Sequence, residues 1–143
     1  MAPNPYKLEL SFSDPEVSGF FVGESSSVKK EIIANIYDIY GDKIELYDKK
    51  DILKEKYNNF KIIWSWYKPD SKEDYKILFD IDDKTTKPYE RINVYFKETI
   101  ASVQEHYSII LAELIVDEEK VAEAFFPIPL YKNNTITVSN VVS

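Results

Sequence analysis

The sequence predicts an α+β fold, in which an antiparallel sheet of about four to six strands packs against two or three helices. Two patterns lead to this prediction. Some segments alternate apolar and polar residues with the period of a strand, whereas others space apolar residues by three and four, as an amphipathic helix does. The chain has 143 residues, 44% of them hydrophobic, which suffices for one buried core. Positions 1–143 are therefore expected to form a single globular domain.

The first third of the chain is expected to contain a strand and a helix. Residues 1–5 are expected to form a disordered arm, and the alternation over 6–12 predicts a half-buried strand. Residues 25–40 begin with three serines that favour a helix N-cap, and Gly41 follows as a stop signal. Between them, apolar residues recur at helical spacing: Val28, Ile32, Ile36, Ile39 and Tyr40. This segment is therefore predicted to be helical.

The middle of the chain predicts most of the sheet. Residues 43–47 favour a short strand, and 49–57 favour two helical turns. Residues 60–67 are nearly all strand formers and carry apolar side chains on both faces, which predicts a central strand. Two further strands are expected at 75–82 and 91–96. Short polar loops between these three strands favour an antiparallel meander with a helix behind it.

The stretch 97–126 is predicted to be mainly helical. Six apolar residues in its first half fit the spacing of an amphipathic helix: Ile100, Val103, Tyr107, Ile110, Leu111 and Leu114. A buried strand over 106–116 is the alternative. Asp117 is expected to cap a second, short helix that stops before Pro127. Residues 132–143 are expected to finish the chain as a terminal hairpin strand.

Composition excludes several classes of function. The chain has no cysteine, and His106 is its single histidine, which excludes thiolate metal sites, a cysteine nucleophile and sites with two imidazoles. Phosphate-cradling and dinucleotide-binding glycine motifs are missing, so we expect no cofactor. One arginine and no basic run longer than a pair make nucleic acid and anionic membranes unexpected partners. No apolar run approaches the roughly 18 residues that cross a bilayer, which favours a soluble, cytoplasmic protein.

Charge and aromatic content favour a protein partner. The net charge is −7, and residues 98–123 hold seven acidic residues against Lys120 alone. The chain also has 11 tyrosines, more than its core requires. An acidic surface steers a basic target, and tyrosines concentrate binding energy at interfaces. The candidate contact residues are Tyr67, Tyr75, Tyr89, Tyr95, Glu105, Glu113, Glu118 and Glu119.

Residues 77–86 contain the one segment with a catalytic pattern. Asp80 and Asp82 follow an apolar strand at spacing i, i+2, so their carboxylates point to one side and could hold a divalent cation. The pair resembles the first motif of haloacid-dehalogenase-like phosphatases, although Asp83 stands where that motif has glycine. It also resembles the aspartate pair of archaeo-eukaryotic primases, whose further histidine and aspartate would correspond to His106 and Asp117. Both resemblances imply metal-dependent phosphoryl or nucleotidyl transfer.

These observations favour a non-catalytic protein-binding module. The expected class is a small acidic inhibitor, an immunity protein or a virus or phage accessory protein that occupies the surface of a partner. The first alternative is phosphoryl or nucleotidyl transfer through a metal held by Asp80 and Asp82. The second is a structural subunit of a virion or filament, in which residues 135–142 add a strand to a neighbouring sheet.

Overall fold

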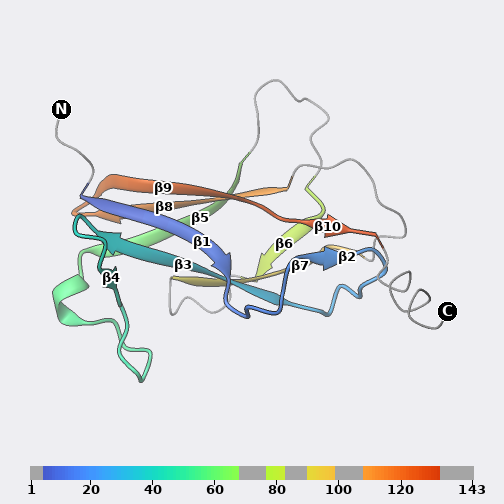
Figure 1. Cartoon of the computed structure of the whole chain (residues 1–143), viewed down its shortest axis with the longest axis horizontal. Coiled ribbons are helices and arrows are strands. Elements are labelled where there is room, and N and C mark those ends of the chain that lie inside the picture. Colours follow the sequence, from blue (N-terminus) through green and yellow to red (C-terminus); the bar gives the residue numbers. More distant parts are fainter. Residues whose placement is uncertain (1–4, 68–76, 83–89, 99–107, 133–143) are drawn as a thin grey trace.

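The computed structural model of the chain describes residues 5–67, 77–82, 90–98 and 108–132, and their regular secondary structure is almost entirely strand (Figure 1). The strands are β1 (Tyr6–Phe12), β2 (Phe20–Phe21), β3 (Lys30–Asp38), β4 (Lys43–Ile44), β5 (Phe60–Tyr67), β6 (Phe79–Asp82), β7 (Arg91–Phe96), β8 (Ile109–Val116), β9 (Glu119–Pro127) and β10 (Leu130–Tyr131). In the described part of the chain, helical structure is confined to one 3₁₀ turn, η1 (Glu55–Tyr57). The predicted α+β fold is therefore wrong, and the protein is a β structure.

The strands form two large antiparallel sheets and one small parallel pair. The first sheet has the order β1-β3-β7-β6, with β4 also paired to β3. The second has the order β5-β8-β9. β2 and β10 pair in parallel over two residues each. β1 of the first sheet lies alongside β9 of the second (Figure 1), so the two sheets meet along this side.

The core lies between the two large sheets and has an aromatic end and an aliphatic end. At the aromatic end, the rings of Phe79 and Phe96 stack 4.8 Å apart, and Phe20 lies 5.1 Å from Phe96. Ile110 of the second sheet completes this cluster. The aliphatic end also draws on both sheets and contains Leu8, Ala34, Ile36, Leu46, Ile62, Ala112 and Leu114. Residues from both sheets share each cluster, which makes the architecture a sandwich.

The predicted helix at 25–40 is instead the strand β3. Ile32, Ala34 and Ile36 alternate with less buried residues and face the core. Residues 32 and 36 are four apart, a spacing that fits one face of a helix and equally one face of a strand. β3 lies between β1 and β7, which together supply hydrogen-bonding partners along its two edges. These non-local ladders decide the conformation, and they favour its β-branched isoleucines.

Over the described residues 108–126 the predicted helices are also wrong, since β8 and β9 form a hairpin there, whereas residues 99–107 of that prediction lie outside the described residues. Ile110, Ala112 and Leu114 alternate toward the core, so the alternative of a buried strand was correct. Asp117 does not cap a helix. Asp117 and Glu118 have φ angles of 51° and 68° and form the two-residue loop between paired Val116 and Glu119. Two successive positive φ angles in such a loop are the signature of a type I′ turn.

The strand predictions had mixed outcomes. The strand at 6–12 is confirmed as β1, and the antiparallel neighbours predicted at 75–82 and 91–96 are confirmed in β6 and β7. The strand at 60–67 is confirmed, but its predicted place in one meander with 75–82 and 91–96 is wrong. It lies in the other sheet and, among the described residues, pairs with β8 alone. The predicted terminal strand at 132–143 lies almost entirely outside the described residues, as do positions 1–4 of the predicted arm.

Between β4 and β5 the chain makes a compact excursion in place of the two predicted helical turns. The Oδ1 atom of Asp48 accepts the backbone N–H groups of Lys50 and Ile52 at 2.8 and 3.0 Å, which closes a tight turn. Leu46 and Tyr47 lie at its start and are buried in the aliphatic end of the core. Only residues 55–57 of the predicted helical segment are helical, as η1. The excursion therefore serves to close one end of the sandwich.

Candidate protein-binding surface

The structure places four of the eight predicted contact residues on the second sheet. Tyr67 ends β5, Glu113 lies in β8, Glu118 lies in the turn between β8 and β9, and Glu119 begins β9. Tyr95 lies in β7 of the other sheet. The remaining three, Tyr75, Tyr89 and Glu105, lie outside the described residues. The second sheet therefore brings together the largest described group of predicted contacts.

The outer face of the second sheet consists of the side chains that point away from the core, and its strand register arranges them in four rows. The rows are Tyr67, Ile109 and Pro127; Ser65, Leu111 and Phe125; Ile63, Glu113 and Glu123; and Lys61, Ile115 and Lys120. One half of this outer face is mainly apolar and the other half carries most of the charge. A partially apolar, solvent-facing sheet surface of this kind is a feature of interaction sites.

The apolar half exposes large side chains from two different strands. Tyr67 is 38% exposed, Phe125 is 49% exposed and Ile63 is 43% exposed. The Tyr67 and Phe125 rings meet edge to face with centroids 5.1 Å apart, across the intervening strand β8. Leu111 lies opposite Phe125 in the same row and is half-buried. Tyr67, Leu111 and Phe125 form an aromatic and aliphatic patch, and Ile63 lies in the next row, opposite Glu113.

In the charged half, Lys120 forms ion pairs with two glutamates. Its Nζ lies 2.9 Å from a Glu123 oxygen and 3.5 Å from a Glu113 oxygen. The hydrogen bond to Glu123 and the charges of both glutamates raise the pKa of Lys120 above its ordinary value. Two carboxylates thus share one ammonium group, which leaves this trio with one net negative charge. Glu118 and Glu119 add acidic groups at the hairpin end of the sheet.

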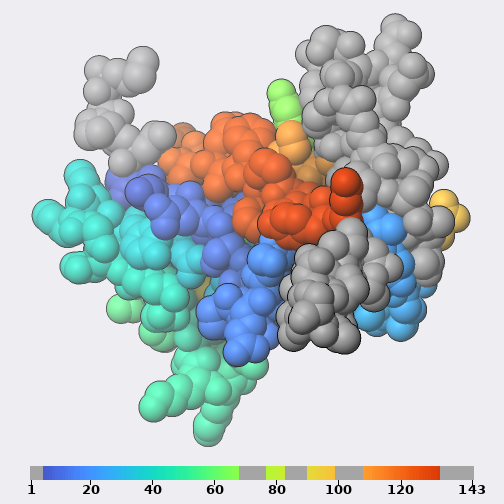
Figure 2. Space-filling model, turned by 45° about the vertical axis from the view of Figure 1, so that its right-hand side comes forward, coloured from blue at the N-terminus to red at the C-terminus, as the bar shows by residue number. Residues whose placement is uncertain are grey.

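Sequence reasoning missed Phe125, Leu111 and Ile63 as contact residues. The predicted helices put Leu111 on an apolar face and gave Phe125 no place on a sheet, whereas Ile63 was predicted on a strand that carries apolar side chains on both faces. The signal that could have found Phe125 is the period of two in β9, where Ala122, Ala124 and Phe126 contact the core and Phe125 points outward. Figure 2 shows the orange atoms of β9 forming a continuous stretch of surface beside the blue atoms of β1.

Asp80 and Asp82 lie on the outer side of the other large sheet and already have protein partners. The Nζ of Lys29 donates to Oδ2 of Asp82 at 2.7 Å, and this bond raises the pKa of Lys29. The Tyr95 hydroxyl lies 3.4 Å from Oδ2 of Asp80. Burial and, secondarily, the Asp80 charge raise the pKa of Tyr95. A cation at this pair would have to compete with the ammonium of Lys29.

Within the described ranges, no three acidic or histidine side chains gather closely enough to hold a metal ion. His106, the histidine that the primase resemblance would use, lies outside those ranges. Asp117, its suggested companion, sits in the β8–β9 turn and accepts a hydrogen bond from Asn59 at 2.8 Å. The prediction of a metal at Asp80 and Asp82 therefore stays a prediction.

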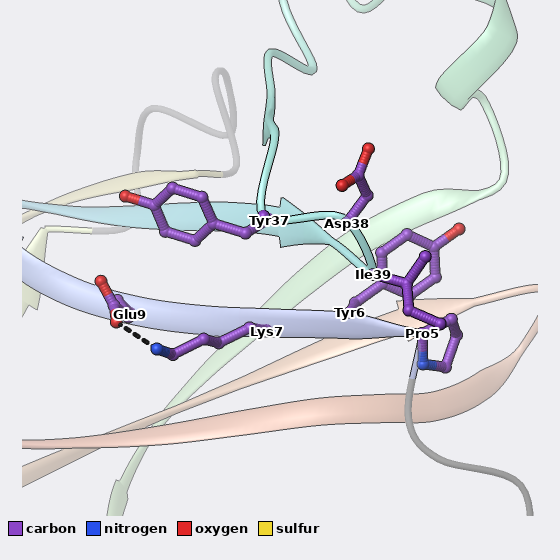
Figure 3. A pocket seen from close by; sticks show the side chains of 8 residues that line it. Pro5, Tyr6, Lys7, Glu9, Tyr37, Asp38 and Ile39 are labelled. Carbon is purple, nitrogen blue, oxygen red and sulfur yellow. Dashed lines mark ion pairs between the residues drawn. The ribbon is translucent and has the colours of Figure 1, made fainter.

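Two of the hollows on the surface have quite different linings. Figure 3 shows one between the start of β1 and the end of β3, where Pro5 and Ile39 lie near Tyr6, and Lys7 and Glu9 form an ion pair of 2.9 Å. Its volume is about 490 Å³. The second is a cleft of about 790 Å³ beside the start of β5. This cleft combines apolar side chains, asparagine amides and carboxylates, which suits a peptide better than a small reactive substrate.

The described part of the chain contains no helix long and apolar enough to cross a membrane. Comparison of the sequence with protein-family models, and of the chain with curated proteins and with solved structures, finds no match.

Proposed function

We propose that this chain is a non-catalytic protein-binding module that acts by occupying the surface of a partner. The observation that carries the proposal is the patch around Tyr67 and Phe125 with Ile63 in the next row, three large side chains exposed together on one sheet face. Exposing them to water is unfavourable, and covering them with a partner removes that penalty. Aromatic side chains held in fixed positions lose little conformational entropy on binding, which makes them effective anchors.

The acidic residues beside the patch favour a partner that carries basic groups. Glu113 and Glu123 share Lys120, and Glu118 and Glu119 lie at the end of the same sheet. Together with a net charge of −7, they favour a partner with an apolar area bordered by lysine or arginine. Charge complementarity of this kind raises the association rate and makes binding weaker at high salt.

The proposal is tested with a double variant, Tyr67→Ser with Phe125→Ser. Tagged wild-type and variant chains are used to capture partners from the native host, and the captured proteins are identified and titrated back as purified proteins. The double variant should bind a purified partner at least about 100-fold more weakly, since hot-spot aromatics contribute about 2 kcal/mol or more each. Glu113→Lys should slow association and remove part of the salt dependence.

The matched control is Tyr40→Ser, which removes an aromatic residue that is 86% exposed in the turn between β3 and β4. This variant should bind like the wild type. Circular dichroism and urea unfolding establish that each variant is folded. If the double variant captures and binds the same proteins as the wild type, the outer face of the second sheet is not the binding surface and the proposal is refuted.

A further inference from the structure

The first residues of β5 present an unpaired strand edge. The backbone N–H of Asp117 donates to the carbonyl of Asn59 at 3.2 Å, which makes these two residues a hydrogen-bonded pair at the end of the β5–β8 ladder. Antiparallel pairs alternate, so the N–H and C=O groups of Lys61 point toward β8. The backbone N–H and C=O groups of Phe60 and Ile62 consequently point away from β8, toward the edge of the sheet. Among the described residues, β5 pairs with β8 alone. No other described segment forms a backbone hydrogen bond with Phe60 or Ile62.

A cleft lies along this edge. Its lining includes Phe60, Lys61 and Ile62 as consecutive residues, so it borders the strand edge, and Lys61 and Ile115 extend it onto the outer face of the sheet. Leu53 and Ile115 contribute apolar walls. Phe60 and Ile62 are 8% and 6% exposed as whole residues, and their side chains pack in the core, which holds the backbone of this edge in a fixed position. Its volume of about 790 Å³ has room for several residues of an extended peptide.

The charge at the cleft is acidic at one end. Asp117 and Glu118 line it at the β8–β9 turn, whereas Lys61 is its one basic lining residue. The carboxylate of Asp117 is fixed by the Asn59 amide at 2.8 Å. Glu118 is held in the turn with a φ of 68°, a conformation unfavourable for a residue with a side chain. An extended segment with a lysine or arginine near this end would complement the two carboxylates.

We propose that the β5 edge is a strand-addition site for an extended, basic segment of a partner protein. The segment pairs its backbone with the N–H and C=O groups of Phe60 and Ile62 and places a cationic side chain beside Asp117 and Glu118. Backbone pairing supplies affinity and the alternating side chains supply selectivity, as in other cases of β-strand addition. This inference rests on the proposed function as a protein-binding module, and it names the class of partner segment.

The test uses a defined probe, a capped octapeptide that alternates valine and lysine. It is titrated into the isotope-labelled full chain, and binding is followed by the amide resonances of Phe60 and Ile62 and by their hydrogen exchange. We expect saturable binding in which both amides shift and exchange more slowly. The same octapeptide with every backbone amide N-methylated keeps its charge and side chains but cannot donate hydrogen bonds, so it should not bind. This control requires no change to the protein.

Two charge variants complete the test. Glu118→Lys should weaken binding of the valine-lysine peptide about five- to ten-fold, the effect of about one charge-assisted contact. Glu16→Lys makes the same change in net charge at an exposed turn between β1 and β2, and should change the affinity less than about two-fold. Equal weakening by both variants, or equal binding of the N-methylated peptide, would mean that the peptide is attracted only by net charge and would overturn the proposal.

The failure of this inference is distinguishable from that of the proposed function. If Tyr67→Ser with Phe125→Ser abolishes binding of a captured partner but the octapeptide does not bind, the β5 edge is not a binding site and the module acts through its outer face alone. If the octapeptide binds but the double variant binds the captured partner like the wild type, the outer face is not the binding surface, and the β5 edge remains supported as a strand-addition site. Dimerisation in which the amides of Phe60 and Ile62 become protected would assign the edge to a second copy and overturn the proposal.

Discussion

At the scale of single residues, Lys30 is the most highly connected basic side chain described here. Its side chain is mostly buried, with 12% exposure, and its ammonium group donates to Glu24 at 2.8 Å and to the carbonyl of Gly19 at 2.7 Å. It also lies 4.6 Å from the centroid of the Phe20 ring. A buried cation needs all of these contacts to offset its lost hydration. Lys30 therefore connects β3 to the segment that carries β2.

Lys30→Met should destabilise the protein by about 2 to 3 kcal/mol, because it leaves the Glu24 carboxylate partly buried without its cation. Urea unfolding monitored by tryptophan fluorescence measures the change. Lys29→Met is the comparison. The Lys29 side chain is 48% exposed against 12% for Lys30, although its partner Asp82 is 17% exposed, so the lost cation is better hydrated and the loss of stability should be smaller. Equal losses for the two variants would contradict the structural role assigned to Lys30.

Glu90 is the buried carboxyl group with a raised pKa. It is 9% exposed, and burial raises its pKa above the usual value of 4.5, against the opposing effect of Arg91. The folded protein therefore binds this proton more tightly than the unfolded chain does. The resulting contribution to stability is fully present below pH 4.5 and is lost as the pH rises through the folded-state pKa.

Glu90→Gln should consequently be more stable than the wild type at pH 7, where the wild type carries a poorly solvated charge, and the difference should shrink at about pH 4. The free energy of unfolding of both proteins, measured in urea from pH 4 to 8, tests this. A difference that is constant over this range would show that titration of Glu90 does not contribute.

At the scale of elements, Gly19 and the β8–β9 turn determine how neighbouring strands meet. Gly19 precedes β2 with a φ of 155°, and a β-carbon placed on it would lie 2.7 Å from the carbonyl oxygen of Pro129. That carbonyl accepts the backbone N–H of Phe20 at 2.9 Å, beside the parallel pairing of β2 with β10. The close approach of these two segments is therefore possible only without a side chain at position 19.

Gly19→Ala should destabilise the protein by about 2 to 4 kcal/mol, because the clash involves backbone atoms that cannot move independently. Gly23→Ala is the comparison. Gly23 also has a positive φ, but a β-carbon there would meet no atom within 4 Å, so only the conformational cost of about 1 kcal/mol applies. Thermal unfolding distinguishes the two, and equal effects would contradict the steric explanation.

The β8–β9 turn offers the opposite test, a substitution that adds stability. Glu118 has a φ of 68° in a type I′ turn, where glycine is preferred. Glu118→Gly should stabilise the hairpin by about 1 kcal/mol, as urea unfolding can measure. It should also weaken binding of the valine-lysine octapeptide. If the variant is more stable but binds the peptide as tightly as the wild type does, Glu118 does not contribute to recognition of the peptide.

At the scale of the whole molecule, the question is whether the chain binds a partner or performs chemistry. Isothermal titration with Mg²⁺ and Mn²⁺ should give no heat of specific binding, because Lys29 already compensates Asp82 at 2.7 Å. Lys29→Met is informative here, since removing the competing ammonium should not by itself create a tight site from two carboxylates. Heat in the wild type that disappears in Asp80→Asn would instead support metal-dependent phosphoryl or nucleotidyl transfer.

Part of this molecule follows directly from local sequence. The alternation over 6–12 identified β1, and the strands predicted at 75–82 and 91–96 identified the antiparallel pair of β6 and β7. The exclusion of thiolate and two-imidazole sites required only counting. Tyr67 and Glu113 were predicted as contact residues from residue type and charge. Phe125 was not, because its place on the outer face depends on β9 being a strand.

The sequence by itself determined the apolar positions, the acidic segment and the residue types available for chemistry. The tertiary structure decided that 30–38 and 109–127 are strands, because apolar residues two and four apart suit either a strand or a helix and only ladder partners distant in the chain select one. It also decided that Tyr67 and Phe125 meet. That contact depends on the register of three strands, which no local pattern contains.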